Sequence, residues 1–125
     1  STQLAIPRRV TNGININRLQ MILAVLQKRL NITIGTHDVF VTVSGGIRIT
    51  EPAIDVPVAL AIVSAFHNKP LPKTLAACGE LGLLGEIKKV QGEVRRIEEA
   101  KRLGYTTVIS AMGEKTLVQA VKKIF

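Results

Sequence analysis

The chain has 125 residues, of which 46% are hydrophobic and 21% are charged, and this composition is typical of a folded domain rather than a disordered segment. Its 17 Lys and Arg against 9 Asp and Glu give a formal net charge of +8, which favours a polyanionic partner, although a basic domain can also use its charge for solubility alone. Aromatic residues make up only 3%, so the core must be built from Ile, Val, Leu and Ala, and base-stacking platforms are disfavoured.

The length suits one domain spanning residues 1–125, which is large enough to bury a core without disulfides or metal ions. Cys78 is the one cysteine and lies in an apolar run, so we expect a small core residue in a reducing compartment and a cytoplasmic protein. His37 and His67 stand far apart, with no spacing that favours a metal site. No signal peptide is visible, and the longest apolar run, residues 56–66, is too short to cross a bilayer, so no membrane partner is expected.

The N-terminal residues predict a strand followed by a turn. Residues 3–10 alternate loosely and contain Pro7, which predicts an edge strand or an extended segment. This segment is expected to carry Arg8 and Arg9 outward. Residues 11–13 then predict a turn.

A helix is predicted next, with Asn15 or Asn17 as its N-cap and with an apolar run at residues 19–26 that turns polar at residues 27–29. Residues 31–35 are expected to end it. The following residues 38–43 are rich in β-branched side chains and predict a central strand.

Two glycines follow this strand and predict a hairpin. Gly45 and Gly46 can adopt the positive φ angles of a tight turn, so residues 47–49 are expected to run back antiparallel. Arg48 would then project to the opposite face from its neighbours, where it is either exposed or bound to another group.

A second apolar helix is predicted to begin at Asp55 or Val56 and to continue to Phe66. Asp55 is expected to be its N-cap, and Pro57 falls in its first turn, where the missing N–H costs little. Because the helix is apolar nearly all round, we expect it to be buried on two sides. Ser64 within it is expected to pack against its own backbone rather than to act in catalysis.

A loop at residues 68–73 separates this helix from a group of short strands. Residues 75–80 predict a short buried strand, and residues 81–90 predict a hairpin bounded by glycine. Lys88 and Lys89 lie on the returning arm of that hairpin.

Residues 93–103 predict an amphipathic helix with Val94, Ile97 and Ala100 on its inward face. Four charged side chains on it are spaced for i,i+4 ion pairs: Arg95 with Glu99, and Glu98 with Arg102.

The chain closes with a strand at residues 106–110 and an amphipathic helix at residues 116–125 capped by Thr116. The complete order is β-α-β-β-α-β-β-β-α-β-α, which predicts a mixed α/β or α+β domain with short strands, hairpins and about four helices. The sequence has no internal repeat, no phosphate-binding glycine loop and none of the common hydrolase motifs. It therefore shows no motif for nucleotide hydrolysis or for the commoner hydrolase reactions.

Residues 38–46, 51–55 and 79–87 together resemble the proteolytic domain of the Lon family, and more specifically the C-terminal Lon-like domain of the bacterial RadA/Sms DNA repair ATPases. Further similarity at residues 17–20 and 98–104 extends the resemblance over nearly the whole chain. It implies a Lon proteolytic-domain-like fold, of the ribosomal protein S5 domain 2-like type.

Lon peptidases use a serine nucleophile and a lysine general base. When Pro52 is set on the proline of the family's Pro-Ser-Ala-Gly motif, Ala53 falls at the nucleophile position. When Gly79 and Gly85 are set on the family's glycines, Val94 falls at the lysine position. A methyl group and an isopropyl group can neither attack a carbonyl nor take a proton, so the resemblance implies that this domain has no catalytic residue and is not an enzyme.

Other serines and lysines leave a peptidase as the alternative. Ser44 or Ser64 could pair with Lys88 or Lys89, but a working Ser–Lys pair needs a desolvated lysine with a lowered pKa. An ATP-independent Ser–Lys peptidase is therefore the competing hypothesis to a non-catalytic domain.

The resemblance also implies that the chain is a domain excised from a longer DNA-dependent ATPase with an N-terminal zinc finger and a RecA-like core. ATP, Mg and Zn would belong to those other parts, and no cofactor is expected in this domain. Lon-type domains assemble as rings, so a hexamer built in part by the helix at residues 55–66 is expected. The implied partners are single-stranded or branched DNA and a recombinase.

Five cations are the candidate DNA-binding residues, because basic side chains supply affinity for phosphate without reading sequence. Arg48 ranks first, beside the Gly-Gly turn; Lys88 and Lys89 follow, with Glu86 as the one local acid, and then Arg18 and the weaker Arg96. The leading hypothesis is a non-catalytic Lon-like module of a branch-migration type DNA repair helicase that acts as ring scaffold and DNA-binding surface. A pure oligomerisation domain without DNA contact is the remaining alternative.

Overall fold

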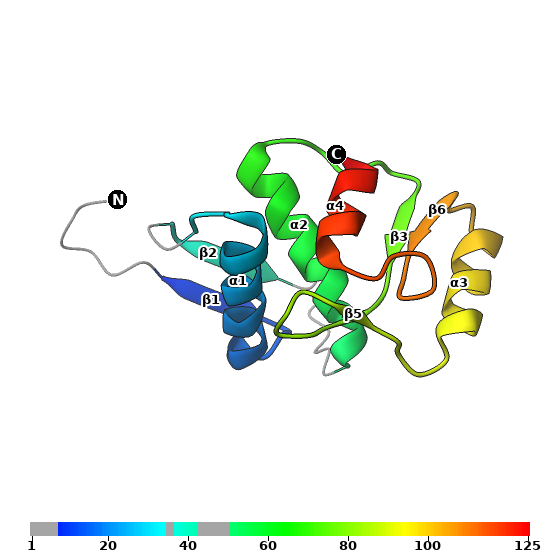
Figure 1. Ribbon diagram of the computed structural model, residues 1–125, viewed down its shortest axis with the longest axis horizontal. Helices are drawn as coiled ribbons and strands as arrows, with labels where there is room; N and C mark the ends of the chain where they lie inside the picture. The colour runs from blue at the N-terminus through cyan, green and yellow to red at the C-terminus, as the bar shows by residue number, and fades with distance from the viewer. Residues whose placement is uncertain (1–7, 35–36, 43–50) are drawn as a thin grey trace. The chain divides into compact units, whose positions relative to one another are not determined.

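A computed structural model describes residues 8–34, 37–42 and 51–125 (Figure 1). The chain divides into two compact units, residues 1–51 (unit 1) and residues 52–125 (unit 2). The described residues contain four α-helices and several short strands in two-stranded sheets, so the predicted mixed α+β class is confirmed.

Unit 1 contains a parallel strand pair and one helix. Strand β1 (Arg9–Asn12) precedes helix α1 (Ile16–Leu30), and strand β2 (Val39–Thr42) follows it. β1 and β2 pair in parallel over four residues, from Arg9 opposite Val39 to Asn12 opposite Thr42. The turn predicted at residues 11–13 is therefore wrong in part, because pairing with β2 keeps the chain extended through Asn12.

Helix α1 begins and ends at the predicted signals. The Asn15 side chain caps it by accepting hydrogen bonds from the backbone N–H groups of Asn17 at 2.8 Å and Arg18 at 3.3 Å. Asn31 ends it in the left-handed conformation, with φ 54°. Lys28 and Arg29 occupy the last turn, where cations complement the helix dipole.

Unit 2 holds the remaining helices and strands in the predicted order. They are the 3₁₀ helix η2 (Pro52–Ile54), α2 (Asp55–His67), β3 (Leu75–Ala77), β4 (Glu80–Leu81), β5 (Ile87–Lys88), α3 (Glu93–Arg102), β6 (Thr107–Ile109) and α4 (Leu117–Ile124). β3 pairs with β6 in parallel, and β4 pairs with β5 in an antiparallel hairpin as predicted. The hairpin predicted at Gly45 and Gly46, with its returning strand at residues 47–49, lies outside the described residues.

Helix α2 starts where it was predicted to start, but its cap differs. Ile54 occupies the N-cap position without a side-chain hydrogen bond, because η2 leads directly into the helix. Asp55 is fully buried, and its Oδ2 accepts a hydrogen bond from the backbone N–H of Leu81 at 3.0 Å. The predicted role of Asp55 as N-cap is therefore wrong. Its carboxyl group accepts an N–H from strand β4, whereas an N-cap side chain accepts an N–H from the first turn of its own helix.

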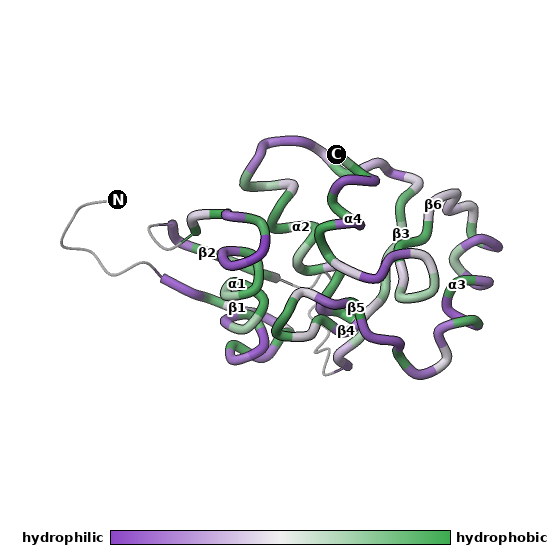
Figure 2. The backbone as a smooth tube through the Cα atoms, viewed as in Figure 1, coloured by the Kyte–Doolittle hydropathy of each residue, from purple (hydrophilic) through white to green (hydrophobic). Residues whose placement is uncertain are grey.

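Two predictions for α3 are wrong and one for α4 is confirmed. Val94 was expected on the inward face but is 51% exposed. Arg102 pairs with Glu99 at i,i+3, with its Nε 3.0 Å from Oε2, instead of with a residue four positions away. The strongly hydrophilic stretch of α3 in Figure 2 agrees with this exposed, charged character. Thr116 caps α4 as predicted, because its Oγ1 accepts from the N–H of Gln119 at 3.2 Å.

Within residues 8–34, 37–42 and 51–125, no helix has both the length and the apolar character needed to cross a bilayer.

Candidate nucleic-acid interface

Ala53, at the position implied for a nucleophile, lies in η2 and is buried. It forms an apolar cluster with the buried side chains of Cys78 and Val90. Its methyl group has no atom that can attack a carbonyl or carry a proton. We call η2, Cys78, Gly79 and Val90 the Ala53 junction.

Backbone hydrogen bonds hold this junction together. The N–H of Gly79 donates to the carbonyl of Ala53 at 2.9 Å, and the N–H of Val56 donates to the carbonyl of Gly79 at 3.1 Å. Gly79 has φ 156°, and a Cβ there would lie 2.8 Å from Cγ2 of Ile87 and 2.9 Å from Cγ2 of Val56. Glycine is therefore required, because a side chain would be both strained and in collision with its neighbours.

Asp55 links the junction to the β4–β5 hairpin. Its carboxyl group accepts the Leu81 N–H inside the protein, and a buried N–H that lost this acceptor would be costly to the fold. Residues 85–87 of the hairpin also bond to the segment before α4, since Ile87 N–H donates to the carbonyl of Lys115 at 2.9 Å and Leu117 N–H donates to that of Gly85 at 2.8 Å. The hairpin that carries Lys88 and Lys89 is thus fixed at both of its strands.

The chemistry near Cys78 is that of a buried thiol. Burial, and secondarily the nearby Glu93 carboxylate, raises the pKa of Cys78, while Arg96 opposes this shift. Since the thiolate is the nucleophilic form, a raised pKa disfavours covalent chemistry at this thiol. The prediction that Cys78 is a core residue is confirmed.

Glu93 is a buried acid that the sequence interpretation missed. It occupies the first turn of α3, and its Oε1 accepts a hydrogen bond from the N–H of Val90 at 3.2 Å. An acidic residue at the start of a helix is a signal for such a contact, because carboxylates stabilise helix N-termini. The bond fastens the start of α3 to the Ala53 junction.

Val94, at the position implied for the lysine, follows Glu93 in α3 and is exposed while Ala53 is buried. A lysine in an exposed position keeps its ordinary pKa and is protonated at neutral pH, whereas a general base must be deprotonated. The environment of residue 94 therefore does not favour general-base chemistry.

Ser64 forms a hydrogen bond to its own segment of chain. Its Oγ donates to the carbonyl of Lys69 at 2.5 Å, so the prediction that it packs against nearby backbone is confirmed. Ser44, the other serine considered for a Ser–Lys pair, lies outside the described residues.

Lys88 and Lys89 are the predicted DNA-binding residues that the structure presents most openly. Both are exposed, and neither forms an ion pair with any residue in the described part of the chain. The prediction that Glu86 is the one acid beside them is wrong, because the strand register places Glu80 opposite Lys88. The two adjacent lysines still form a concentrated positive charge on a fixed hairpin.

The other predicted cations are placed less favourably. Arg96 is half-buried, and its Nε donates to the carbonyl of Gln91 at 2.9 Å. Arg18 is a half-buried residue near the start of α1 in unit 1. Arg48, the first-ranked candidate, lies outside the described residues.

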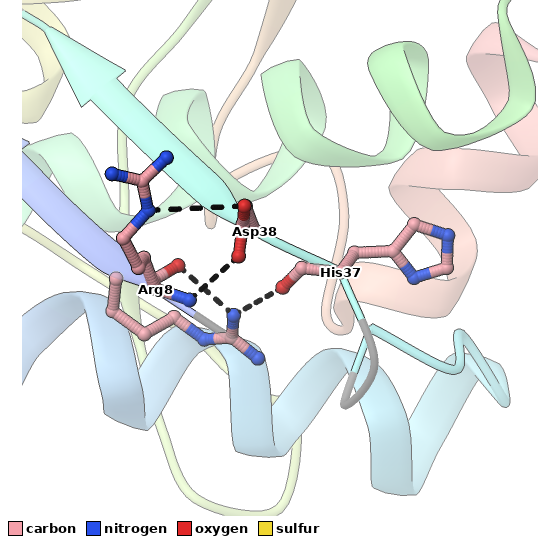
Figure 3. A network of polar contacts seen from close by, with 4 residues as sticks. Arg8, His37 and Asp38 are labelled. Atoms are coloured by element: carbon pink, nitrogen blue, oxygen red, sulfur yellow. Dashed lines mark hydrogen bonds and ion pairs between the residues drawn. The ribbon is translucent and has the colours of Figure 1, made fainter. Parts of the chain in front are cut away.

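Arg8 and Arg9, both expected to project outward, have different environments (Figure 3). Arg8 is exposed, and Asp38 lies beside it: Oδ1 accepts the Arg8 backbone N–H at 2.7 Å and Oδ2 lies 3.9 Å from its Nε. Arg9 is half-buried, and its guanidinium donates to the backbone carbonyls of Arg8, His37 and Ile34. The outward prediction is right for Arg8 and wrong for Arg9, which ties the strands together.

Comparison with known protein families identifies the chain. A family model described as subunit ChlI of Mg-chelatase matches residues 14–114. The chain belongs to this family. The match extends over parts of both units, from the segment between β1 and α1 to the segment before α4.

Curated relatives carry the name DNA repair protein RadA. The chain is 45% identical over 103 residues to that of Mycobacterium tuberculosis (strain H37Rv), a match covering 82% of this chain and 22% of the relative. It is 42% identical over 114 residues to that of Haemophilus influenzae, covering 91% and 25%. For Streptococcus pyogenes serotype M3 the identity is 38% over 133 residues, covering 94% and 29%. The chain thus spans about a quarter of the length of the curated relatives it matches.

Across the described ranges, no three or more His, Cys, Asp or Glu residues are grouped as a metal ion would require.

Proposed function

We propose that residues 1–125 make up one non-catalytic Lon-like domain of a DNA repair ATPase, and that this domain serves as a ring scaffold and a DNA-binding surface. The observation that carries the proposal is the pair of exposed lysines, Lys88 and Lys89, on a fixed hairpin in a chain whose relatives are named DNA repair protein RadA. Their charge suits a phosphate backbone, which is bound through cations without reading of sequence.

The lack of catalytic chemistry is supported by the environments of the two dyad positions. Ala53 is buried among Cys78 and Val90, and Val94 is exposed on α3. The thiol nearest to Ala53 has a raised pKa, and the hydroxyl of Ser64 is bonded to a carbonyl. We infer that the fold of a Ser–Lys peptidase has been kept here without its reaction.

The longer protein follows from the same family reasoning. We propose that this chain is joined to a zinc finger and a RecA-like ATPase core, which would bind Zn, ATP and Mg and would hydrolyse ATP in a DNA-dependent reaction. The domain would assemble as a hexamer, act on single-stranded or branched DNA, and meet a recombinase as a further partner. Light scattering of the chain at high concentration tests the ring, and a strictly monomeric chain would contradict it.

A salt-series titration tests DNA binding. Fluorescence anisotropy is measured with labelled single-stranded and branched DNA for the wild-type chain, the Lys88→Ala/Lys89→Ala double variant and Arg48→Ala. If both lysines contact phosphates, the slope of log affinity against log salt falls by about 2 for the double variant. Lys73→Ala is the matched control, because Lys73 is also an exposed lysine but lies in the loop before β3.

Three results would decide between the alternatives. If the slope of log affinity against log salt is the same in the double variant as in the wild type, Lys88 and Lys89 do not contact the DNA. No binding by the wild-type chain at low salt would favour pure oligomerisation. Cleavage of an unfolded protein without ATP, lost in Ser44→Ala, would establish the peptidase instead.

A further inference from the structure

One side of the β1–β2 pair carries exposed apolar side chains. In the parallel register Val10 lies opposite Phe40, and both are exposed, Phe40 by 58%. The alternate residue Val39 is buried, which is the pattern of a sheet with one covered side and one open side. We call Arg8, Val10 and Phe40 the Phe40 face.

A cation lies over the ring on this face. Cζ of Arg8 is 5.4 Å from the centroid of the Phe40 ring, within the range of a cation–π contact. Asp38 holds Arg8 through the backbone N–H and through Nε, and Figure 3 shows the two terminal nitrogens of its guanidinium directed away from Asp38. Because the Arg8 side chain is 70% exposed, these nitrogens are accessible to an anion from outside.

The strands below this face are held in place by Arg9. Its guanidinium donates to three backbone carbonyls, and the N–H of Val39 donates to the carbonyl of Arg8 at 2.8 Å. The Phe40 ring and the Arg8 guanidinium are thus presented on a fixed support. A ring that is already positioned loses less conformational entropy when a ligand stacks on it.

The charge of unit 1 also selects for an anionic ligand. Its sequence has six basic side chains and two acidic ones: Arg8, Arg9, Arg18, Lys28, Arg29 and Arg48 against Asp38 and Glu51. The Phe40 ring carries the Arg8 guanidinium over one part of its surface and still keeps most of its area exposed. An exposed ring next to an accessible guanidinium in a basic surrounding suits a ligand with both a π-face and a phosphate.

We propose that the Phe40 face binds unpaired bases of a single-stranded nucleic acid, with one base stacked on Phe40 and an adjacent phosphate bound by Arg8. In a duplex the faces of the bases are already stacked, whereas a single strand can offer one to a protein ring. A second copy of the chain fits less well, because two apolar side chains are far fewer than the 20 to 30 residues a side of about 800 Å² that a stable interface buries. The inference rests on the proposed function in that nucleic acid is the partner.

The test compares a normal strand with one that cannot stack. Fluorescence anisotropy is measured on the 125-residue chain with a labelled oligothymidine and with an abasic strand of the same length and charge. Phe40→Ala is expected to weaken binding of oligothymidine about tenfold and to leave the abasic strand unaffected. Phe40→Trp is expected to retain affinity, and its indole fluorescence should be quenched by oligothymidine but not by the abasic strand.

Phe125→Ala is the matched control, since Phe125 is 38% exposed but lies in unit 2. Phe40→Ala could weaken binding equally on both strands, or not weaken it at all. Either result would overturn this inference and would leave the proposed binding of DNA by Lys88 and Lys89 unaffected. A dimer that dissociates in Phe40→Ala would assign the face to a second copy and overturn it as well. If the wild-type chain binds no strand at low salt, both this inference and the proposed DNA-binding function are wrong.

Discussion

The Ala53 junction and the Phe40 face differ in how far their polar and apolar groups are exposed to solvent. Next to the junction, Asp55 and Glu93 are buried, and each accepts a backbone N–H through one carboxylate oxygen, while within it the carbonyl of Ala53 accepts the N–H of Gly79. On the Phe40 face, the ring and the neighbouring guanidinium are exposed, and the terminal nitrogens of Arg8 are directed away from Asp38 (Figure 3).

This difference separates structural residues from residues that can meet a ligand. A buried carboxylate that accepts a backbone N–H stabilises its own fold, and its burial keeps it away from an outside molecule. An exposed ring on a fixed strand contributes little to the core and keeps its surface for binding. Substitutions at the junction should therefore change stability, and substitutions on the Phe40 face should change binding.

The largest effect is expected for Asp55→Ala. It removes the acceptor of the Leu81 N–H and leaves that donor buried without its partner, so we expect the free energy of unfolding to fall by about 3 kcal/mol. Urea denaturation followed by circular dichroism measures the change. Glu98→Ala serves as the control, because this exposed acid should change stability by no more than about 0.5 kcal/mol. Equal stability of the two variants would show that the Asp55 contact is not structural.

A somewhat smaller loss is expected for Gly79→Ala. The new methyl group would meet Ile87 and Val56 below 3.0 Å at a φ that disfavours side chains, and such overpacking costs about 2 kcal/mol. Gly113→Ala is the matched control, since a Cβ there meets no atom within 4 Å. Thermal unfolding of both variants checks this, and a Gly79→Ala protein as stable as Gly113→Ala would mean that the junction can expand.

Cys78 is expected to make a smaller, pH-dependent contribution to the free energy of unfolding. Its pKa is raised above the ordinary value of 9.0, so the unfolded chain loses the thiol proton before the folded chain does. Stability from this group is thus fully present below pH 9.0 and is lost as the pH rises through the folded-state pKa. Urea midpoints at pH 8 and pH 10 for the wild type and Cys78→Ala measure it.

The same thiol can be probed by its reactivity. At pH 8, a disulfide reagent such as Ellman's reagent should react with native Cys78 at least about tenfold more slowly than with the urea-unfolded chain, because burial and the raised pKa both disfavour the thiolate. Equal rates would show that the Ala53 junction is open to solvent and that Cys78 is not a buried thiol.

The smallest change in stability is expected for Phe40→Ala. Because the ring is mostly exposed, the free energy of unfolding should change by no more than about 0.5 kcal/mol. Ile22→Ala, in the buried part of α1, is the contrasting core truncation and should cost about 2 to 5 kcal/mol. If Phe40→Ala destabilised the chain as much as Ile22→Ala, the Phe40 ring would be part of the core. It would then not be exposed to a base, and the proposed binding by this face would be wrong.

Local signals predicted much of the fold. The caps Asn15 and Thr116, the end of α1 at Asn31 and the β4–β5 hairpin all appear where the sequence places them, because caps and turns depend on a few neighbouring residues. Predictions that needed distant contacts failed more often. Asp55 is bonded to a strand instead of capping its helix, and Val94 is exposed although its spacing suggested an inward face.

The candidate site was predictable only in part, for the same reason. The sequence identified Lys88 and Lys89 on a hairpin arm, and it gave no reason to separate Arg8 from Arg9. It also argued against stacking platforms from a low aromatic content, which says nothing about where a single ring lies. Glu93 was missed because its burial depends on the loop that delivers the Val90 N–H.

The sequence alone determined the order of elements, the basic charge, and the absence of a serine and a lysine from the two positions that the Lon resemblance marks, since these depend on residue identity and short-range pattern. Only the tertiary structure decided that Ala53 is buried and Val94 exposed, that Asp55 and Glu93 are buried and accept backbone N–H groups, and that Phe40 is exposed beside Arg8. Burial and partner choice are set by segments far apart in the chain, and no local pattern encodes which of them will meet.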